Sequence, residues 1–294
     1  MREFLRLDNK LILKLKIKPL SPLLIKLGNK EKDSEDKDGN YIGFLTTESS
    51  TETKLEYNGG SEKISEDNRK GEIYIPGSSL RGAFRDKTLD IFENNEEEVK
   101  KIYGKSDDDK SQKTRIFIGD AFLYKVDDRK RFYSDNDKIS ESLKDILKSR
   151  SITPIDHFSG KATVPLKFEY TTENFLTEIT VNNISLKELK TLYFIFRDSI
   201  NGELRIGNSK TRGFGQIELE IEEMIYYKYY GKKELIKDMN KYFERVEEKS
   251  IKIGDKYLCE ALKLKGDKEK KKDFNKIDIE NPNEFIKALF VEVE

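Results

Sequence analysis

The most informative stretch of the sequence is Ile206-Gly207-Asn208-Ser209-Lys210-Thr211-Arg212-Gly213-Phe214-Gly215-Gln216, a glycine-rich loop that carries two cations. Its three glycines free φ for left-handed turns and remove side chains that would hold another polymer away. Successive backbone N–H groups in such a loop can form a nest that binds an anion. Lys210 and Arg212 then favour a phosphate chain as the ligand.

The loop follows a predicted helix and precedes a predicted strand. Ser185 and Glu188 are spaced as a capping box, apolar residues recur at helical spacing, and Asn201-Gly202 is a stop signal. Residues 216–221 alternate as a half-buried strand does. This order excludes a P-loop and a dinucleotide fingerprint, because both need a strand, the loop and then a helix. The alternative is a tight helix-to-strand connection whose glycines serve geometry alone.

Composition limits the class of protein. The 294 residues suffice for one elaborated domain or two small ones, and the 56 basic and 56 acidic residues cancel, so any basic surface is local. Charged residues make up 38% of the chain, against roughly 25% in typical globular proteins, which favours a thin layered fold with solvated insertions. The single Cys259 excludes an internal disulfide and fits a reducing cytosol. No segment suits export or membrane spanning, so we expect a cytoplasmic protein with no membrane partner.

The first half of the chain predicts a strand, an insertion and a helix. Apolar residues and lysines alternate from Leu11 to Ile17, which predicts a strand with one face in the core. Residues 28–71 are charged and lack periodicity, so they predict a long insertion. From Ile73 a strand breaks at Pro-Gly and leads into a helix that reaches Phe92.

The start of that helix is a candidate anion site. Ser78 or Ser79 is expected as the N-cap, the helix offers spare N–H donors, and Arg81 and Arg85 lie one turn apart. The alternative is an ordinary capped helix with solvated arginines.

The second half of the chain carries shorter signals. The predicted strands span 115–126, with Gly119-Asp120 as a bulge, then 168–170 and 175–181; helix is predicted within 127–150 and over about 234–248. The only histidine, His157, lies in a turn-rich loop. With one distant cysteine it cannot form a zinc site, and the simplest interpretation is a loop histidine bonded to nearby backbone.

Together these elements predict an α+β fold with a ferredoxin-like β-α-β-β-α-β core and long inserted loops. We place the core at 1–221, with insertions at about 28–71 and 127–175. Residues 222–294 are expected to form a C-terminal extension of mixed helix and strand.

Three separated motifs resemble one family. They are Tyr74-Ile75-Pro76-Gly77-Ser78-Ser79-Leu80-Arg81-Gly82, Ile155-Asp156-His157-Phe158-Ser159-Gly160-Lys161-Ala162 and the loop from Ile206 to Gly215. In order and placement they look like the RAMP superfamily of CRISPR-associated proteins, most of all the backbone subunits of type III effector complexes. The resemblance covers roughly residues 10–221.

The resemblance implies an RRM-like fold that binds guide RNA along its backbone, stacks with other CRISPR effector subunits and presents the guide to target RNA. The segment 156–162 would lie near a thumb-like insertion that wedges between guide and target. Such phosphate contacts position a strand without reading its sequence. The residues expected to bind RNA are Ser78, Ser79, Arg81, Arg85, His157, Lys161, Gly207, Lys210, Arg212, Gly213 and Gly215.

Catalysis is a separate expectation of the same resemblance. Relatives that cut target RNA use an acidic residue between the first strand and the first helix, so Asp33 and Asp36, with Mg²⁺, are the candidates here. Glu48 stands where active relatives are expected to carry an aspartate. Two alternatives stay open: a guide-processing endoribonuclease that uses His157, and a non-catalytic subunit that caps one end of the complex.

Overall fold

The structure is a computed structural model, which describes residues 7–26, 41–46, 73–105, 112–124, 146–229, 235–247, 250–266 and 282–291. The strands are β1 (Asn9–Pro19), β2 (Tyr41–Ile42), β3 (Tyr74–Ile75), β4 (Ile116–Ile118), β5 (Ala121–Leu123), β6 (Lys148–Ile152), β7 (Leu166–Tyr170), β8 (Phe175–Asn182), β9 (Ile217–Tyr229), β10 (Phe243–Arg245), β11 (Ile251–Ile253) and β12 (Lys256–Leu264). The helices are α1 (Gly77–Ile91), α2 (Glu96–Tyr103), α4 (Leu186–Ile200), the 3₁₀ turn η2 (Lys210–Arg212), α5 (Met239–Tyr242) and α6 (Glu284–Leu289). The predicted α+β class is confirmed.

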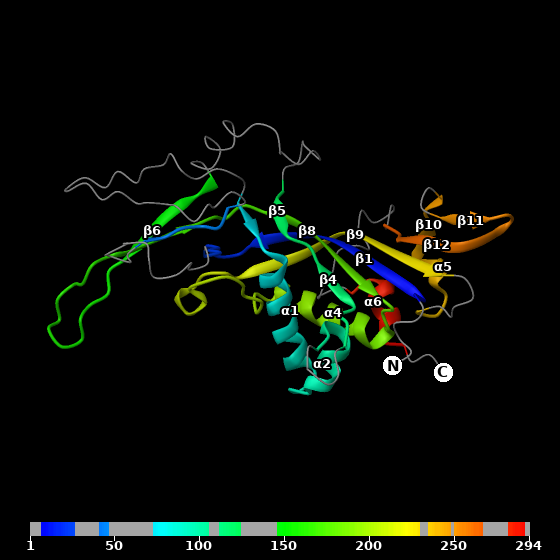
Figure 1. The fold of residues 1–294 in the computed structure, drawn as a ribbon, viewed down its shortest axis with the longest axis horizontal. Coiled ribbons are helices and arrows are strands. Elements are labelled where there is room, and N and C mark those ends of the chain that lie inside the picture. Colours follow the sequence, from blue (N-terminus) through cyan, green and yellow to red (C-terminus); the bar gives the residue numbers. More distant parts are fainter. Residues whose placement is uncertain are drawn as a thin grey trace.

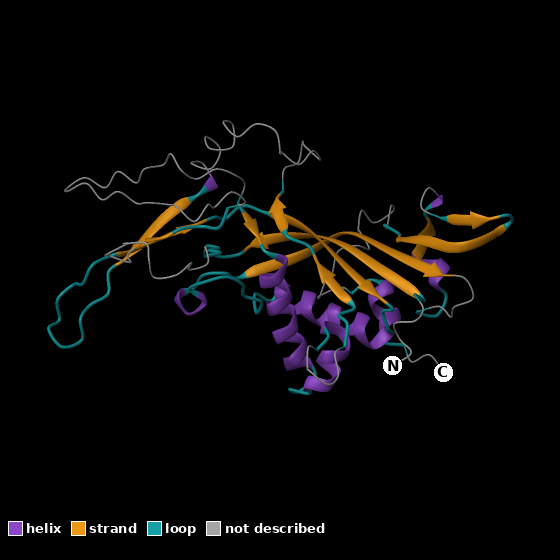
Figure 2. Ribbon diagram, in the orientation of Figure 1, coloured by secondary structure: helices purple, strands orange, loops and turns teal. Residues whose placement is uncertain are grey.

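Within the described residues, nine strands form one antiparallel sheet in the order β10-β12-β9-β1-β8-β5-β3, with β4 also on β8 and β11 on β12. Helix α1 lies between β1 and the pair β4 and β5 in sequence, and α4 lies between β8 and β9. The central order β9-β1-β8-β5 is the order expected of a β-α-β-β-α-β unit. Figure 2 shows the helices gathered on one face of this sheet.

Strand β1 is the centre of the core. Leu11, Leu13, Leu15 and Ile17 are at most 1% exposed, because alternate residues of a strand point to one face. Strand β1 pairs with β8 on one side and β9 on the other. The helices cover this apolar face, and α1 and α4 meet through the Phe84 and Phe196 rings, whose centroids are 6.3 Å apart.

The opposite face of β1 carries lysines, as predicted. Lys14 and Lys18 are paired with glutamates of β9, and Lys16 lies over the Tyr124 ring (4.5 Å). Lys14 lies 2.5 Å from Glu223, and Lys18 lies 2.7 Å from Glu220. The hydrogen bond to Glu220 raises the pKa of Lys18. Burial acts to raise the pKa of Glu223, but its lysine neighbours outweigh burial and lower it. Two of the lysines on this face are therefore neutralised within the chain.

Two expected elements differ from the structure. The strand predicted over 115–126 is divided into β4 and β5 at Gly119-Asp120, where a bulge is predicted. The start of α1 lies against the chain here, since a Cβ on Gly77 would lie 2.2 Å from the Ile118 carbonyl oxygen. The long helix predicted at 234–248 is wrong. Among the described residues 235–247, the α-helix is limited to α5, and Phe243 follows it into β10, where its ring packs 5.6 Å from that of Phe285.

Other expectations fall partly outside the described residues. Helix was predicted within 127–150, but Lys148–Ile152 is strand β6, and 125–145 lie outside the described residues. The predicted strands at 168–170 and 175–181 are confirmed as β7 and β8. Strand β9 runs through the expected boundary at residues 221 and 222, and β12 pairs with its second half.

A smaller sheet, ordered β2-β7-β6, extends from one end of the molecule, and the hairpin of β11 and β12 lies at the other (Figure 1). Strands β6 and β7 are antiparallel and continue into a projecting loop at 153–165.

Candidate nucleic-acid interface

The glycine-rich loop is fastened to the segment that follows β1. The Gly215 N–H donates to the Pro22 carbonyl (2.8 Å), and the Asn208 N–H donates to the Leu24 carbonyl (2.8 Å). The loop closes on itself where the Ile206 N–H donates to the Gly215 carbonyl (2.9 Å). These bonds leave η2 as the part of the loop that projects from the sheet.

The three glycines have different neighbours. Each has a left-handed φ, of 78° at Gly207, 86° at Gly213 and 81° at Gly215. A Cβ would lie 2.3 Å from the Leu24 carbonyl oxygen at Gly207 and 2.0 Å from the Ile206 carbonyl oxygen at Gly215, but would meet nothing within 4 Å at Gly213. Close contact with the chain's own backbone thus explains why glycine is needed at Gly207 and Gly215, as expected if the loop is only a tight helix-to-strand connection. RNA contact at these two glycines stays a prediction.

Lys210 and Arg212 are exposed on η2. The Arg205 guanidinium donates to the Lys210 carbonyl (3.1 Å) and closes the turn beneath them. Among the described residues neither cation forms an ion pair. The loop therefore presents two charged groups that are available to an anion.

An aromatic cluster that the sequence reasoning missed joins the loop to β7. Phe214 is fully buried, and its ring centroid lies 6.1 Å from those of both Phe168 and Tyr170. The Arg212 guanidinium lies over the Phe168 ring (5.7 Å), and that of Arg150 lies over the Phe214 ring (5.9 Å). No local pattern in the sequence marks this contact, since loop and strand are far apart along the chain.

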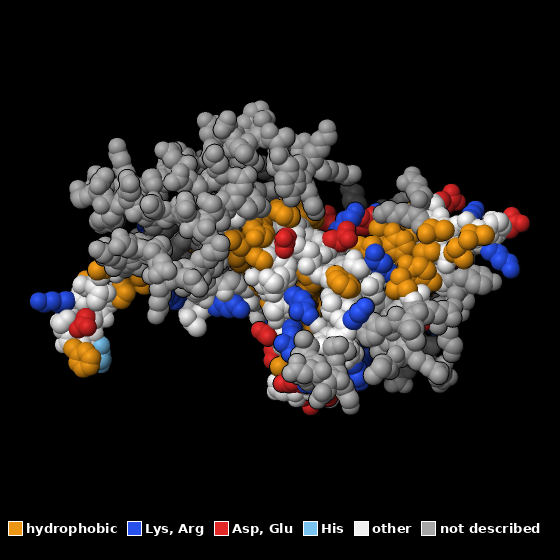
Figure 3. All heavy atoms as spheres, in the orientation of Figure 1, with side chains coloured by type: hydrophobic (Ala, Val, Ile, Leu, Met, Phe, Trp, Pro, Cys, Tyr) orange, Lys and Arg blue, Asp and Glu red, His pale blue; other side chains and the backbone are white. Residues whose placement is uncertain are grey.

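The loop beyond β6 and β7 ends in an ordered turn. The Asp156 carboxylate accepts from the backbone N–H groups of Ser159 (2.6 Å) and Phe158 (3.1 Å), and these bonds lower its pKa. Phe158 is 97% exposed, and His157 and Lys161 are exposed beside it. Figure 3 shows the histidine and an apolar side chain at this projecting tip. The tip thus lies at the far end of the projecting loop at 153–165, away from the glycine-rich loop.

The start of α1 differs from the expected anion site. Pro76 is the N-cap, not Ser78 or Ser79, and no side chain caps the helix. The Gly77 N–H already donates to the Asp120 carboxylate (2.7 Å), so a carboxylate of the chain itself occupies this position.

The two arginines of α1 also diverge. Arg81 donates to the Tyr103 carbonyl at the end of α2 and lies over the Tyr103 ring. Arg85 is exposed, as is Ser78, while Ser79 is half-buried. Of the residues predicted in this motif, Ser78 and Arg85 are the most accessible to a ligand.

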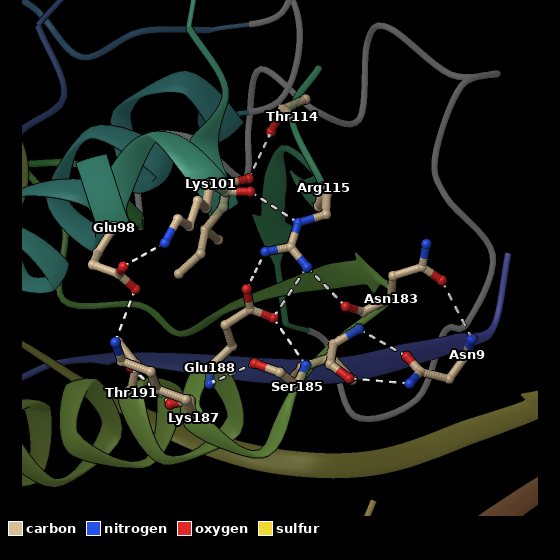
Figure 4. A network of polar contacts seen from close by, with 12 residues as sticks. Asn9, Glu98, Lys101, Thr114, Arg115, Asn183, Ser185, Lys187, Glu188 and Thr191 are labelled. Atoms are coloured by element: carbon tan, nitrogen blue, oxygen red, sulfur yellow. Dashed lines mark hydrogen bonds and ion pairs between the residues drawn. The ribbon is translucent and has the colours of Figure 1, made fainter. Parts of the chain in front are cut away.

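A polar network lies at the opposite end of α4 (Figure 4). The Arg115 guanidinium pairs with the Glu188 carboxylate and donates to the carbonyls of Lys101 and Asn183, both at 2.8 Å. Glu188 also completes the predicted capping box with Ser185, which is confirmed. The network lines a cavity of about 370 Å³ between α2, α4 and the start of β1. Its bonds are internal, so it joins elements and is not our candidate interface.

The catalytic candidates Asp33 and Asp36 lie outside the described residues. Among the residues that are described, no group of three or more His, Cys, Asp or Glu side chains could hold a metal ion. No helix in the described ranges is long and apolar enough to cross a membrane.

The fold and the loop define an α+β protein with one main antiparallel sheet and a local cationic loop beside it. A sequence profile of the RAMP superfamily matches residues 16–218, and the chain belongs to that superfamily.

Comparison with individual proteins adds little to this assignment. No curated protein matches the sequence. Among solved structures, a chain from the cryo-EM structure of the Type III-B Cmr-beta bound to cognate target RNA aligns with 71% of this chain and 96% of its own length, at 15% sequence identity and a TM-score of 0.45.

Proposed function

We propose that this protein is an RNA-binding backbone subunit of a type III CRISPR effector ribonucleoprotein and that it positions guide RNA against target RNA. The observation that carries the proposal is the glycine-rich loop, which holds Lys210 and Arg212 exposed and without ion pairs among the described residues. Membership of the RAMP superfamily supports it. Phosphate oxygens are the expected ligands, so binding is tolerant of RNA sequence.

The sheet face is a poorer candidate for the RNA. RRM domains bind RNA on the face of their sheet, where bases stack on aromatic residues. On this face two cations that could contact the RNA phosphates, Lys14 and Lys18, are already paired with glutamates. We therefore assign the guide backbone to the loop. Phe158 lies almost fully exposed on the hydrogen-bonded turn at the projecting tip. The proposal places this apolar side chain between guide and target.

Charge reversal of the loop tests the proposal. Lys210→Glu together with Arg212→Glu should weaken binding of labelled single-stranded RNA in fluorescence anisotropy. The slope of log affinity against log salt is negative, and it should become shallower by about 0.7 for each phosphate that the protein no longer neutralises, because fewer counterions are released. Unchanged affinity and slope would refute the assignment.

Phe158→Ala is the matched comparison. It removes an exposed apolar group and no charge, so the salt slope should equal that of the wild type. Single-stranded DNA and duplex DNA measured alongside establish whether RNA is preferred.

Cleavage of target RNA is a finer proposal that rests on the family resemblance. It assigns catalysis to Asp33 and Asp36, with Mg²⁺. In an assembled complex, replacement of both by Ala should abolish Mg²⁺-dependent cuts in target RNA while guide binding persists. Cuts that continue at the wild-type rate contradict this assignment. Cuts in precursor RNA by the isolated protein that are lost in His157→Ala would instead support the guide-processing alternative.

A further inference from the structure

We infer that Arg150 and Arg212 together hold one phosphodiester group of single-stranded RNA at the junction of the glycine-rich loop and strand β6. The inference rests on the proposed RNA-binding role of the loop and adds a residue from a second element. We call the two arginines and the rings beneath them, Phe168 and Phe214, the arginine clamp.

The clamp brings together parts of the chain that are far apart in sequence. Arg150 is directly opposite Phe168 in the register of β6 and β7, so both side chains lie on one face of this small sheet. Its guanidinium nevertheless lies over the Phe214 ring of the loop (5.9 Å), while that of Arg212 in the loop lies over the Phe168 ring (5.7 Å). Each arginine thus lies over the ring contributed by the other segment.

The rings fix the positions of the two cations. Phe168 and Phe214 are both fully buried, and their centroids are 6.1 Å apart. Stacking on an aromatic face holds a guanidinium plane while leaving its N–H edge available. Arg150 and Arg212 are themselves exposed, so solvent or a ligand reaches them.

The charges of the clamp are not balanced within the described chain. Three other described arginines, Arg115, Arg197 and Arg245, pair with carboxylates, whereas Arg81 and Arg205 donate to backbone carbonyls. Neither Arg150 nor Arg212 has a carboxylate partner among the described residues. Glu169 follows Phe168 on β7 and therefore lies on the other face, where it accepts from the Phe44 N–H (2.9 Å).

Because the two guanidiniums lie over the two rings of one packed pair, the proposal places a single anion between them. A phosphodiester is the anion that suits them best, because guanidinium forks bind phosphate oxygens in paired hydrogen bonds. Neighbouring Lys210 would contact another phosphate of the same strand. Such a clamp reads the RNA backbone and not its bases.

The test measures coupling between the two arginines in the full-length protein. Arg150→Gln and Arg212→Gln should each weaken binding of labelled single-stranded RNA about tenfold, the effect expected for one charge-assisted hydrogen bond. Because both bind the same group, the double variant should be at most about threefold weaker than either single variant. A hundredfold weakening in the double variant would mean that the two act independently and would overturn the shared site.

Two controls separate this inference from the proposed function. Arg245→Gln removes the same charge from an exposed ion pair with Glu260 and should leave affinity unchanged. Lys210→Gln tests the loop alone. If it weakens RNA binding while Arg150→Gln has no effect, the proposed function stands and the clamp does not.

A second measurement tests the clamp where the isolated protein binds RNA too weakly for anisotropy. The Nε–H signals of arginine side chains are followed by NMR during titration with pyrophosphate. Signals of Arg150 and Arg212 that shift together, with one dissociation constant, support a shared phosphate site. The absence of a shift at either arginine overturns the clamp.

Discussion

Gly207, Gly213 and Gly215 share a left-handed backbone but differ in what surrounds them. Gly207 and Gly215 approach carbonyl oxygens of the chain itself, and Gly213 faces open space. Since only glycine adopts such φ values without strain, all three are conformationally required. The closed surroundings of two of them add a steric requirement that has no connection with RNA.

This difference predicts the cost of adding a methyl group. Gly207→Ala and Gly215→Ala should each destabilise the protein by more than about 3 kcal/mol, because backbone strain and a clash with backbone add together. Gly213→Ala should cost only about 1 kcal/mol, from the positive φ alone. Urea unfolding of the three variants checks the order. Equal destabilisation at all three positions would show that the loop packs differently from the structure.

At the residue scale, the sequence predicted the loop's cations but not their supports. Lys210 and Arg212 were identifiable because charges within a glycine-rich loop are a local pattern. Arg150 and Phe168 were not, because their contact with the loop depends on how the small sheet folds back against it. The sequence also did not indicate that the Arg81 side chain donates to the Tyr103 carbonyl, and RNA binding by Arg81 stays a prediction.

At the scale of elements, α4 is fixed at its start by two overlapping devices. Ser185 and Glu188 cap the helix, and Glu188 also pairs with Arg115, whose side chain is 9% exposed. The capping box was evident from the sequence, because it is local. The ion pair was not, since Arg115 precedes β4 and is distant from α4 along the chain.

The two devices can be separated by mutation. Ser185→Ala removes the cap and should cost about 1 kcal/mol. Glu188→Ala also leaves the Arg115 charge buried without its carboxylate and should cost about 3–5 kcal/mol. Thermal or urea unfolding measures both. If Glu188→Ala destabilises the protein no more than Ser185→Ala does, the pair contributes nothing to stability.

At the scale of the whole molecule, the extension after residue 221 continues the main sheet. Strand β9 crosses the expected boundary, β12 pairs with its second half, and Leu262 and Leu264 are at most 5% exposed. Phe243 packs its ring against Tyr226 and Phe285 within the extension, and the Phe290 ring lies 5.5 Å from that of Tyr193 of α4, which joins the extension to the rest of the core.

The extension should therefore unfold together with the rest of the protein. A chain that ends at Ile221 should fail to unfold cooperatively, because it lacks the second half of β9 and the strands paired with it. Phe243→Ala in the full chain should lower the midpoint of a single transition, by about 3–5 kcal/mol in free energy. Two separate transitions in calorimetry, or a stable 1–221 fragment, would show instead that the extension is an independent domain.

Short-range sequence patterns were enough to predict individual strands, one capped helix and the position of the loop. Alternation marked β1, β8 and the start of β9, the capping box marked α4, and the glycine-rich loop was placed between α4 and β9. Long-range contacts decided the remainder. The start of α1 lies against the chain between β4 and β5, sheet pairing draws Phe243 into β10, and the buried rings of Phe168 and Phe214 bring Arg150 to the loop. These three contacts depend on which surfaces pack together after the sheet has formed, and local sequence patterns do not specify that packing.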